Sequence, residues 1–280
     1  MKLRPSIRRL PTVRFLSTWS RRGPSVRRSR HAWFAAFALL LLAVTDSVFP
    51  TATVANNLRE TSETSTTPAP EYDRGWFRQK QLNATVKQHP DAELVFIGDS
   101  ITQGWDYEGP RWGHNVWMKY YGKRRAINLG SGGESTQHVL WRLDHGNLNG
   151  LHFKLAVLLI GTNNAASNTP DEIRDGVRAI VEKLRSRVPG CKVLVLGIFP
   201  RGRDPNDRLR KVNEAANKKI EKLADGKQVF YLDVGPKFLG PNGSISRNIM
   251  PDFLHLNEKG YEIWASAIEP EVARLLGETR

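Results

Sequence analysis

The chain has 280 residues, with 42 Lys and Arg against 28 Asp and Glu, which gives a net charge of +14. Its content of 40% hydrophobic and 25% charged residues is typical of a globular protein and excludes a disordered or fibrous one. The single cysteine, Cys191, excludes an internal disulfide framework and a zinc site built from cysteines. The charge would favour nucleic-acid binding only if it lay on the folded part of the chain.

Most of the basic excess lies at the N-terminus. Residues 1–55 hold ten Lys and Arg and one acid, Asp46, and so carry +9 of the +14. An apolar run at residues 32–44 follows the basic stretch. This order is typical of an export signal, and the run is short for a membrane-spanning helix, which needs about 20 apolar residues.

We therefore expect residues 1–55 to engage the export machinery, with cleavage after Ala55. An uncleaved membrane anchor is the alternative. Either reading predicts an exported protein, periplasmic or extracellular, or one tethered to the membrane. The remaining chain is only +5, with interspersed charges, so we expect no nucleic-acid partner.

Residues 56–70 are rich in Thr, Ser and Pro, which predicts a flexible linker. The folded part then covers residues 71–280, a length that suits a single α/β domain. Five short apolar runs without strict alternation predict strands covered on both faces. They lie at residues 93–98, 125–129, 155–160, 192–198 and 228–233.

Helical patterns lie between and after these runs, at residues 170–187, 205–224 and 258–276. The first of them begins with Thr169 as a cap and Pro170 in the first turn, both typical of a helix start. Strands that alternate with helices predict a parallel sheet with helices on both faces. Ligands in such folds bind at the carboxyl ends of the strands, so the residues that follow each strand are the candidates for chemistry.

Ser100 follows the first strand, after Gly98 and Asp99. A serine at a strand-to-helix turn is well placed as a nucleophile, because the helix N-terminus favours developing negative charge. Ser and Asp are also ordinary helix caps, which is the alternative. Asn163 and Asn164 follow the third strand and are either oxyanion donors or turn residues.

A glycine-rich run, which begins at Gly130, follows the second strand. Glycines let backbone N–H groups approach a ligand closely, although a plain turn capped by Ser135 or Thr136 is the alternative. The run lacks the Gly-Lys-Ser/Thr ending of a phosphate-binding P-loop.

Asp252 precedes His255 by three residues, just before the last helix. A histidine can take a serine proton when a carboxylate holds its other ring nitrogen, and this spacing allows both side chains to face one pocket. A surface histidine is the alternative. Asp-x-x-His by itself is a poor metal site.

Ser100, Gly130, Asn163 and His255 match the four motifs of the SGNH hydrolases, also called GDSL-type esterases. The chain most resembles the catalytic alpha subunits of intracellular platelet-activating factor acetylhydrolase and their bacterial relatives, from about Trp76 to Leu276. The segments that carry the resemblance are residues 138–150, 160–164, 195–207, 209–217 and 250–265. The resemblance implies a three-layer α/β/α, flavodoxin-like fold with a five-stranded parallel sheet.

The same resemblance implies a role for each matching residue. Ser100 is the nucleophile, His255 the general base and then acid, and Asp252 the residue that orients it. The oxyanion hole consists of the backbone N–H groups of Ser100 and Gly130 and the side-chain amide of Asn163. The family uses no metal or organic cofactor, and its animal members form dimers, so a homodimer is an expectation here.

These residues predict a serine esterase that removes acetyl or other short acyl groups, from an acetylated carbohydrate or a lipid like platelet-activating factor. One alternative is a lipase or phospholipase. Trp105, Trp112 and Trp117 would then line an acyl pocket, unless they are core or helix-face aromatics. A non-catalytic surface binding module is another.

Two arginines follow the fourth strand, at Arg201 and Arg203. They could bind an anionic substrate group or pair with Asp204 or Asp207 within their loop.

Overall fold

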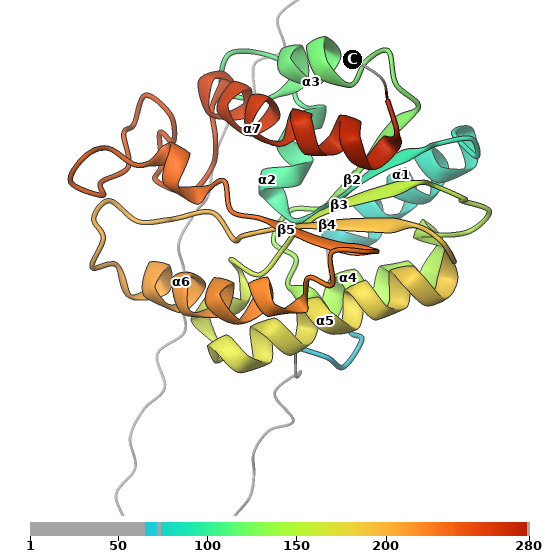
Figure 1. The fold of residues 1–280 in the computed structure, drawn as a ribbon, viewed down its shortest axis with the longest axis horizontal. Coiled ribbons are helices and arrows are strands. Elements are labelled where there is room, and N and C mark those ends of the chain that lie inside the picture. The colour runs from blue at the N-terminus through green and yellow to red at the C-terminus, as the bar shows by residue number, and fades with distance from the viewer. Residues whose placement is uncertain (1–64, 72–73, 279–280) are drawn as a thin grey trace, which may run out of the picture. The chain divides into compact units, whose positions relative to one another are not determined.

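The structure, a computed structural model, describes residues 65–71 and 74–278 (Figure 1). The predicted export segment therefore lies outside the described residues. The centre of the fold is a parallel sheet with the order β2-β1-β3-β4-β5. Its strands are β1 (Leu94–Gly98), β2 (Ala126–Gly130), β3 (Leu155–Leu159), β4 (Lys192–Leu196) and β5 (Val229–Leu232). This order is the flavodoxin-like one, so the predicted fold class is confirmed.

Helices cover both faces of the sheet, which explains why its strands are apolar without alternation (Figure 1). One layer contains α1 (Arg74–Gln88), α4 (Thr136–Arg142), α5 (Pro170–Arg187) and α6 (Arg208–Ile220). The other contains α2 (Ser100–Gln103), α3 (His114–Tyr120) and α7 (Glu258–Leu276). Short helical turns lie at Gly104–Asp106, Leu143–Asn147, Asn164–Ala166, Glu221–Leu223 and Gly235–Phe238.

The strongest local signals mark helix ends correctly. Thr169 caps α5 by accepting from the N–H of Glu172, whose side chain bonds back to the Thr169 N–H, so the helix begins where predicted. Asn257 caps α7 by accepting from the N–H of Gly260, and Gly277 ends the helix in the left-handed conformation. The predicted helix at 205–224 is shorter, because Asp207 caps it and α6 begins at Arg208.

A segment before α1 packs against the domain where we predicted a flexible linker. Ser65 is buried, its hydroxyl donates to the Glu172 carbonyl at 2.5 Å, and its own carbonyl accepts from Thr136 Oγ1 at 2.8 Å. Ala69 N–H donates to the Gln137 carbonyl. We call residues 65–71 the strap. The linker prediction is therefore wrong for residues 65–70, where backbone and serine hydrogen bonds override a polar composition, and residues 56–64 lie outside the described residues.

Candidate active site

Ser100, His255 and Asp252 form a hydrogen-bonded chain at the carboxyl end of the sheet. Ser100 Oγ lies 2.9 Å from His255 Nε2, and His255 Nδ1 lies 2.7 Å from Asp252 Oδ2. The serine and the histidine lie far apart in the sequence, and only the fold brings them together. This is the geometry in which an imidazole can take a serine proton while a carboxylate stabilises the charge that results.

The turn from Asp252 to His255 is held from two sides. Asp252 Oδ1 accepts from the backbone N–H groups of Leu254 and His255, and Phe253 has a positive φ of 61°. From outside the turn, the N–H of Gly202 donates to the Phe253 carbonyl at 2.9 Å. Partial burial raises the pKa of Asp252, but the hydrogen bonds from His255 outweigh it and the net pKa is lowered. Asp252 is therefore a carboxylate when it faces the imidazole.

The position of Ser100 is fixed by the way β1 ends. Asp99 caps α2 by accepting from the Ile101 N–H at 2.9 Å, so Ser100 is the first helical residue and its N–H has no acceptor within the helix. Gly98 must be a glycine, because an added Cβ would lie 2.2 Å from the Leu159 carbonyl oxygen. Burial raises the pKa of Asp99 to about 7, against the hydrogen bond from Ile101. The structure thus shows Asp99 as the helix cap and Ser100 facing His255, and the role of Ser100 as nucleophile stays a prediction.

Gly130 does not fit the role that we predicted for it in the oxyanion hole. Its N–H already donates to Asn128 Oδ1 at 3.0 Å, and its carbonyl accepts from Arg78 at 2.7 and 2.9 Å. A Cβ at this position would lie 2.2 Å from the backbone nitrogen of Gln103. The glycine is needed because β2 and α2 approach each other closely here, and we correct its assignment accordingly.

The next two glycines of the run lie nearer to Ser100. A Cβ on Gly132 would lie 3.7 Å from Ser100 Cβ, and the Gly132 N–H donates to Gln103 Oε1 at 2.6 Å. Gly133 is exposed, has a φ of 81°, and its N–H has no hydrogen bond within the part of the chain that the structure describes. Both glycines line the cleft with Ser100. Gly133 therefore replaces Gly130 as the candidate backbone donor. The sequence shows three glycines close together and does not indicate which of them is the donor.

Asn163 lies in the same cleft, as predicted, and its amide is oriented from below. Its Nδ2 donates to the Glu134 carbonyl at 2.7 Å, which leaves its second N–H for a ligand. The neighbouring Asn164 is fully buried and bonds to Thr136, Gln137 and Asn168. One asparagine of the pair thus belongs to the site and the other to the framework.

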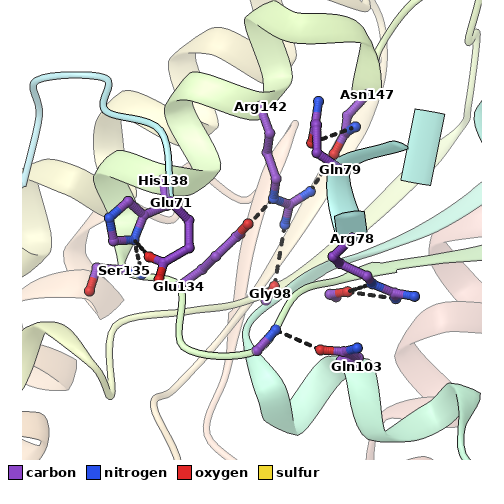
Figure 2. Close-up of polar contacts among 12 residues, drawn as sticks. Glu71, Arg78, Gln79, Gly98, Gln103, Glu134, Ser135, His138, Arg142 and Asn147 are labelled. Atoms are coloured by element: carbon purple, nitrogen blue, oxygen red, sulfur yellow. Dashed lines mark hydrogen bonds and ion pairs between the residues drawn. The ribbon is translucent and has the colours of Figure 1, made fainter. Parts of the chain in front are cut away.

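A buried ion pair that the sequence analysis missed supports this loop (Figure 2). Arg142 Nε donates to Glu134 Oε2 at 2.7 Å, and both side chains are almost fully buried. The same guanidinium reaches Asn147 Oδ1 at 2.8 Å and the Gly98 carbonyl at 3.3 Å (Figure 2). Arg142 therefore connects the loop that holds Asn163 with the end of β1, two residues before Ser100. The available signal was a charge at Arg142 directly after the apolar residues 139–141.

The site opens into a cleft of about 1010 Å³. Ser100, His255, Asn163 and the two glycines line it, and we call them the floor. Residues of the strap, of α1 and of the segment after α2 also line it, and we call them the rim. Trp105 and Trp117 pack in the core around Phe96, and Trp112 packs against Tyr107. None of the three tryptophans lines the cleft, so the core interpretation holds for Trp105 and Trp117.

Arg201 also serves the framework. Its NH1 donates to both oxygens of Thr162, the residue before Asn163, at 3.0 and 3.2 Å, and it does not line the cleft. Arg203 is exposed. Cys191 is buried, and burial raises the pKa of its thiol to about 11, which makes it a poor nucleophile.

The described residues lack two further features, a metal cluster and a membrane-spanning helix. Within the ranges 65–71 and 74–278, no group of three or more His, Cys, Asp or Glu side chains could hold a metal ion. Over the same residues, none of the helices has the length and apolar character needed to cross a membrane.

Comparison with known proteins places these features in one family. The model of the GDSL-like lipase/acylhydrolase family matches residues 96–263. Platelet-activating factor acetylhydrolase IB subunit alpha1 of Bos taurus is 36% identical over 205 residues, which cover 73% of this chain and 85% of that protein.

Among solved structures, a GDSL-like lipase of Bacteroides thetaiotaomicron is similar with a TM-score of 0.58 and 22% identity, over 71% of this chain and 97% of that one. A carbohydrate acetylesterase of Sinorhizobium meliloti is similar with a TM-score of 0.52 and 20% identity, over 65% and 98% of the two chains. These two likenesses concern the fold. With its Ser-His-Asp chain, its family match and its acetylhydrolase relatives, the protein belongs to the GDSL-like lipase/acylhydrolase family, the SGNH hydrolases, and is a carboxylic ester hydrolase.

Proposed function

We propose that the enzyme removes acetyl or other short acyl groups through an acyl-enzyme on Ser100. The observation that carries the proposal is the hydrogen-bonded chain from Ser100 through His255 to Asp252, set beside two candidate oxyanion donors in one cleft. The acetylhydrolase relatives support the short acyl group. None of the three tryptophans that the lipase alternative would place in an acyl pocket lines the cleft.

In the first half of the reaction, Ser100 Oγ attacks the ester carbonyl carbon while His255 Nε2 takes the hydroxyl proton. The carbonyl oxygen becomes an oxyanion that accepts from the N–H groups of Ser100 and Gly133 and from the Asn163 amide. When the tetrahedral intermediate collapses, the bond to the alcohol oxygen breaks and His255 gives its proton to that oxygen. The alcohol leaves, and the acyl group stays on Ser100.

In the second half, water takes the place of the alcohol. His255 removes a proton from the water, the hydroxyl oxygen attacks the acyl carbon, and the same donors hold the oxyanion. The bond to Ser100 Oγ then breaks, and His255 returns the proton to the serine. Asp252 stays ionised throughout, because its hydrogen bonds with His255 keep its pKa low. The products are the free acid and the regenerated enzyme.

The test is hydrolysis of p-nitrophenyl esters of increasing chain length by the full chain. We expect the highest kcat/KM on acetate and a loss of about 10⁴-fold or more in kcat for Ser100→Ala, because the nucleophile is removed while the oxyanion donors remain. Ser266→Ala, an exposed serine on α7, is the control and should keep full activity. Normal turnover by Ser100→Ala would refute the mechanism, and a maximum on long chains would favour the lipase alternative.

Export is part of the same proposal. It rests on the basic N-terminal segment and the apolar run at residues 32–44, which lie outside the described residues. N-terminal sequencing of the mature protein tests it, with a start at Asn56 as the expected result. A homodimer stays a prediction, for which the mass in solution is the measurement.

A further inference from the structure

The cleft around Ser100 is larger than a short acyl group requires. At about 1010 Å³ it reaches the upper end of the range for ligand pockets in proteins. Its floor, with Ser100, His255 and Asn163, accounts for the reacting ester. The space that extends to the strap and α1 is therefore available to the alcohol part of the substrate, the acyl acceptor.

Exposed aromatic rings lie on this rim. Within the ranges 65–71 and 74–278, four large hydrophobic side chains are exposed, and two of them line the cleft: Phe77 on α1, which is 70% exposed, and Tyr107 after α2, which is 41% exposed. Leaving a phenylalanine in water forfeits the hydrophobic gain of burying it, so an exposed ring at a cleft indicates a ligand that covers it. The ring offers a flat apolar face.

The groups beside these rings are polar. Gln81 projects from the same helix one turn after Phe77, Gln103 donates to the Tyr107 hydroxyl at 2.6 Å, and Glu71 belongs to the strap. Figure 2 shows the Glu71 side chain directed toward His138, whose Nδ1 lies 3.3 Å away. An alkyl chain laid over this rim would remove water from amides and carboxylates without replacing their hydrogen bonds. A ligand with hydroxyl groups would replace them.

The charge of the rim also limits the ligand. Among the described residues that line the cleft, Arg78 is the one Lys or Arg, and it is held by Asp106 at 2.6 Å and by the Gly130 carbonyl. Glu71 and Asp106 add two carboxylates to the same lining. A phosphate group is held best by several unpaired cationic donors, and this rim has a surplus of negative charge instead.

We infer that the rim formed by Phe77, Tyr107 and Gln81 is an acceptor subsite for an uncharged sugar ring of an acetylated oligosaccharide. A pyranose ring presents C–H groups on its face and hydroxyls around its edge. The face stacks on an aromatic ring, and the hydroxyls bond to the amides beside it. This inference rests on the proposed function, since it assigns the acceptor of the ester that Ser100 attacks.

The test compares two neighbouring aromatic residues of α1. Phe77→Ala removes the ring that lines the cleft, and Trp76→Ala, the matched control, removes an exposed ring that packs edge-on against Trp141 and does not line it. The substrates for the full chain are acetylated xylo-oligosaccharides, p-nitrophenyl acetate and platelet-activating factor. We expect Phe77→Ala to raise KM for the oligosaccharide by about 3- to 10-fold and Trp76→Ala to leave that KM unchanged. Phe77→Trp should restore the wild-type KM.

A binding measurement makes the outcomes separable. Calorimetry with the Ser100→Ala chain measures affinity for the intact acetylated oligosaccharide without turnover, and adding Phe77→Ala should weaken it by the same factor. If p-nitrophenyl acetate is not hydrolysed, the proposed function fails while this binding result still decides the subsite. Equal oligosaccharide affinity with and without Phe77, or a preference for platelet-activating factor that Phe77→Ala leaves intact, would overturn the inference.

Discussion

The floor and the rim of the cleft are built in opposite ways. On the floor, Ser100, His255 and Asn163 are each held by a hydrogen bond to a neighbouring side chain or carbonyl. On the rim, Phe77 is largely exposed. Groups that must meet a transition state need fixed positions, whereas a ring that meets a sugar needs only an open face. The difference fits the two proposals above, in which the reaction belongs to the floor and the choice of alcohol to the rim.

The largest effect that would test this division is expected from the buried ion pair beneath the floor. Arg142→Met leaves the Glu134 carboxylate buried without its charge partner, which should lower the free energy of unfolding by about 3–5 kcal/mol. Urea unfolding of the full chain measures it. The double variant with Glu134→Met should recover part of the loss, because no buried charge is then unpaired.

The control for Arg142 is a surface pair. Arg274 and Glu271 lie one turn apart on α7 at 2.5 Å, and exposed pairs of this kind contribute about 1 kcal/mol or less. Arg274→Met should therefore leave the unfolding midpoint nearly unchanged. Equal losses of unfolding free energy for Arg142→Met and Arg274→Met would show that the buried pair contributes no more to stability than the surface pair.

The two adjacent asparagines separate chemistry from framework. Asn163→Ala should reduce kcat on p-nitrophenyl acetate by about 10²–10³-fold with little change in Tm, because it removes an oxyanion donor. Asn164→Ala should do the reverse. It leaves the buried Thr136 N–H without an acceptor, which costs about 1–3 kcal/mol of stability, and the folded enzyme should keep its kcat.

Steady-state kinetics and thermal melts on both asparagine variants give the comparison. If Asn163→Ala lowers Tm while kcat is unchanged, Asn163 belongs to the framework and the oxyanion assignment is wrong. If both variants lose kcat alone, the loop acts as one unit and the division between the two residues fails.

The last comparison concerns two acids, Asp252, which bonds to His255, and Asp99, which precedes Ser100. Asp252 has a lowered pKa, whereas burial raises the pKa of Asp99 to about 7. In the unfolded chain Asp99 loses its proton near pH 4, whereas in the folded protein it keeps the proton up to about pH 7. The free energy of unfolding therefore falls as the pH rises from about 4 to about 7. Asp99 should therefore lower stability by about 2–3 kcal/mol between pH 5 and pH 8.

Asp99→Asn tests this, because the amide oxygen can still accept from the Ile101 N–H but carries no charge. Urea unfolding at pH 5 and at pH 8 should show that the free energy of unfolding of the variant, relative to that of the wild type, increases as the pH rises. Asp225→Asn is the control. The pKa of Asp225 is lowered to about 2 by backbone hydrogen bonds, so its contribution is lost only as pH falls toward that value and should be constant over this range. A wild-type advantage that does not change with pH would contradict the assignment for Asp99.

Much of the fold was predictable because its signals are local. The five apolar runs became the five strands within two residues at each end, since strands buried on both faces must be apolar along their length. The box at Thr169 and Glu172 fixed the start of α5. By contrast, α1 was not predicted. Among its apolar residues only Leu82 and Val86 are buried, so the helix has no continuous apolar face that the sequence pattern could show.

By itself, the sequence determined which residue types follow each strand, and with them Ser100, Asn163, Asp252 and His255. Parallel strands bring their carboxyl ends to one edge, so order along the chain was enough to predict that these residues meet. Only the tertiary structure decided between Gly130 and Gly133, because the choice depends on how closely β2 approaches α2 and on which N–H is already bonded. It also decided that the strap and α1 border the cleft, since packing between segments distant in the chain leaves no local pattern.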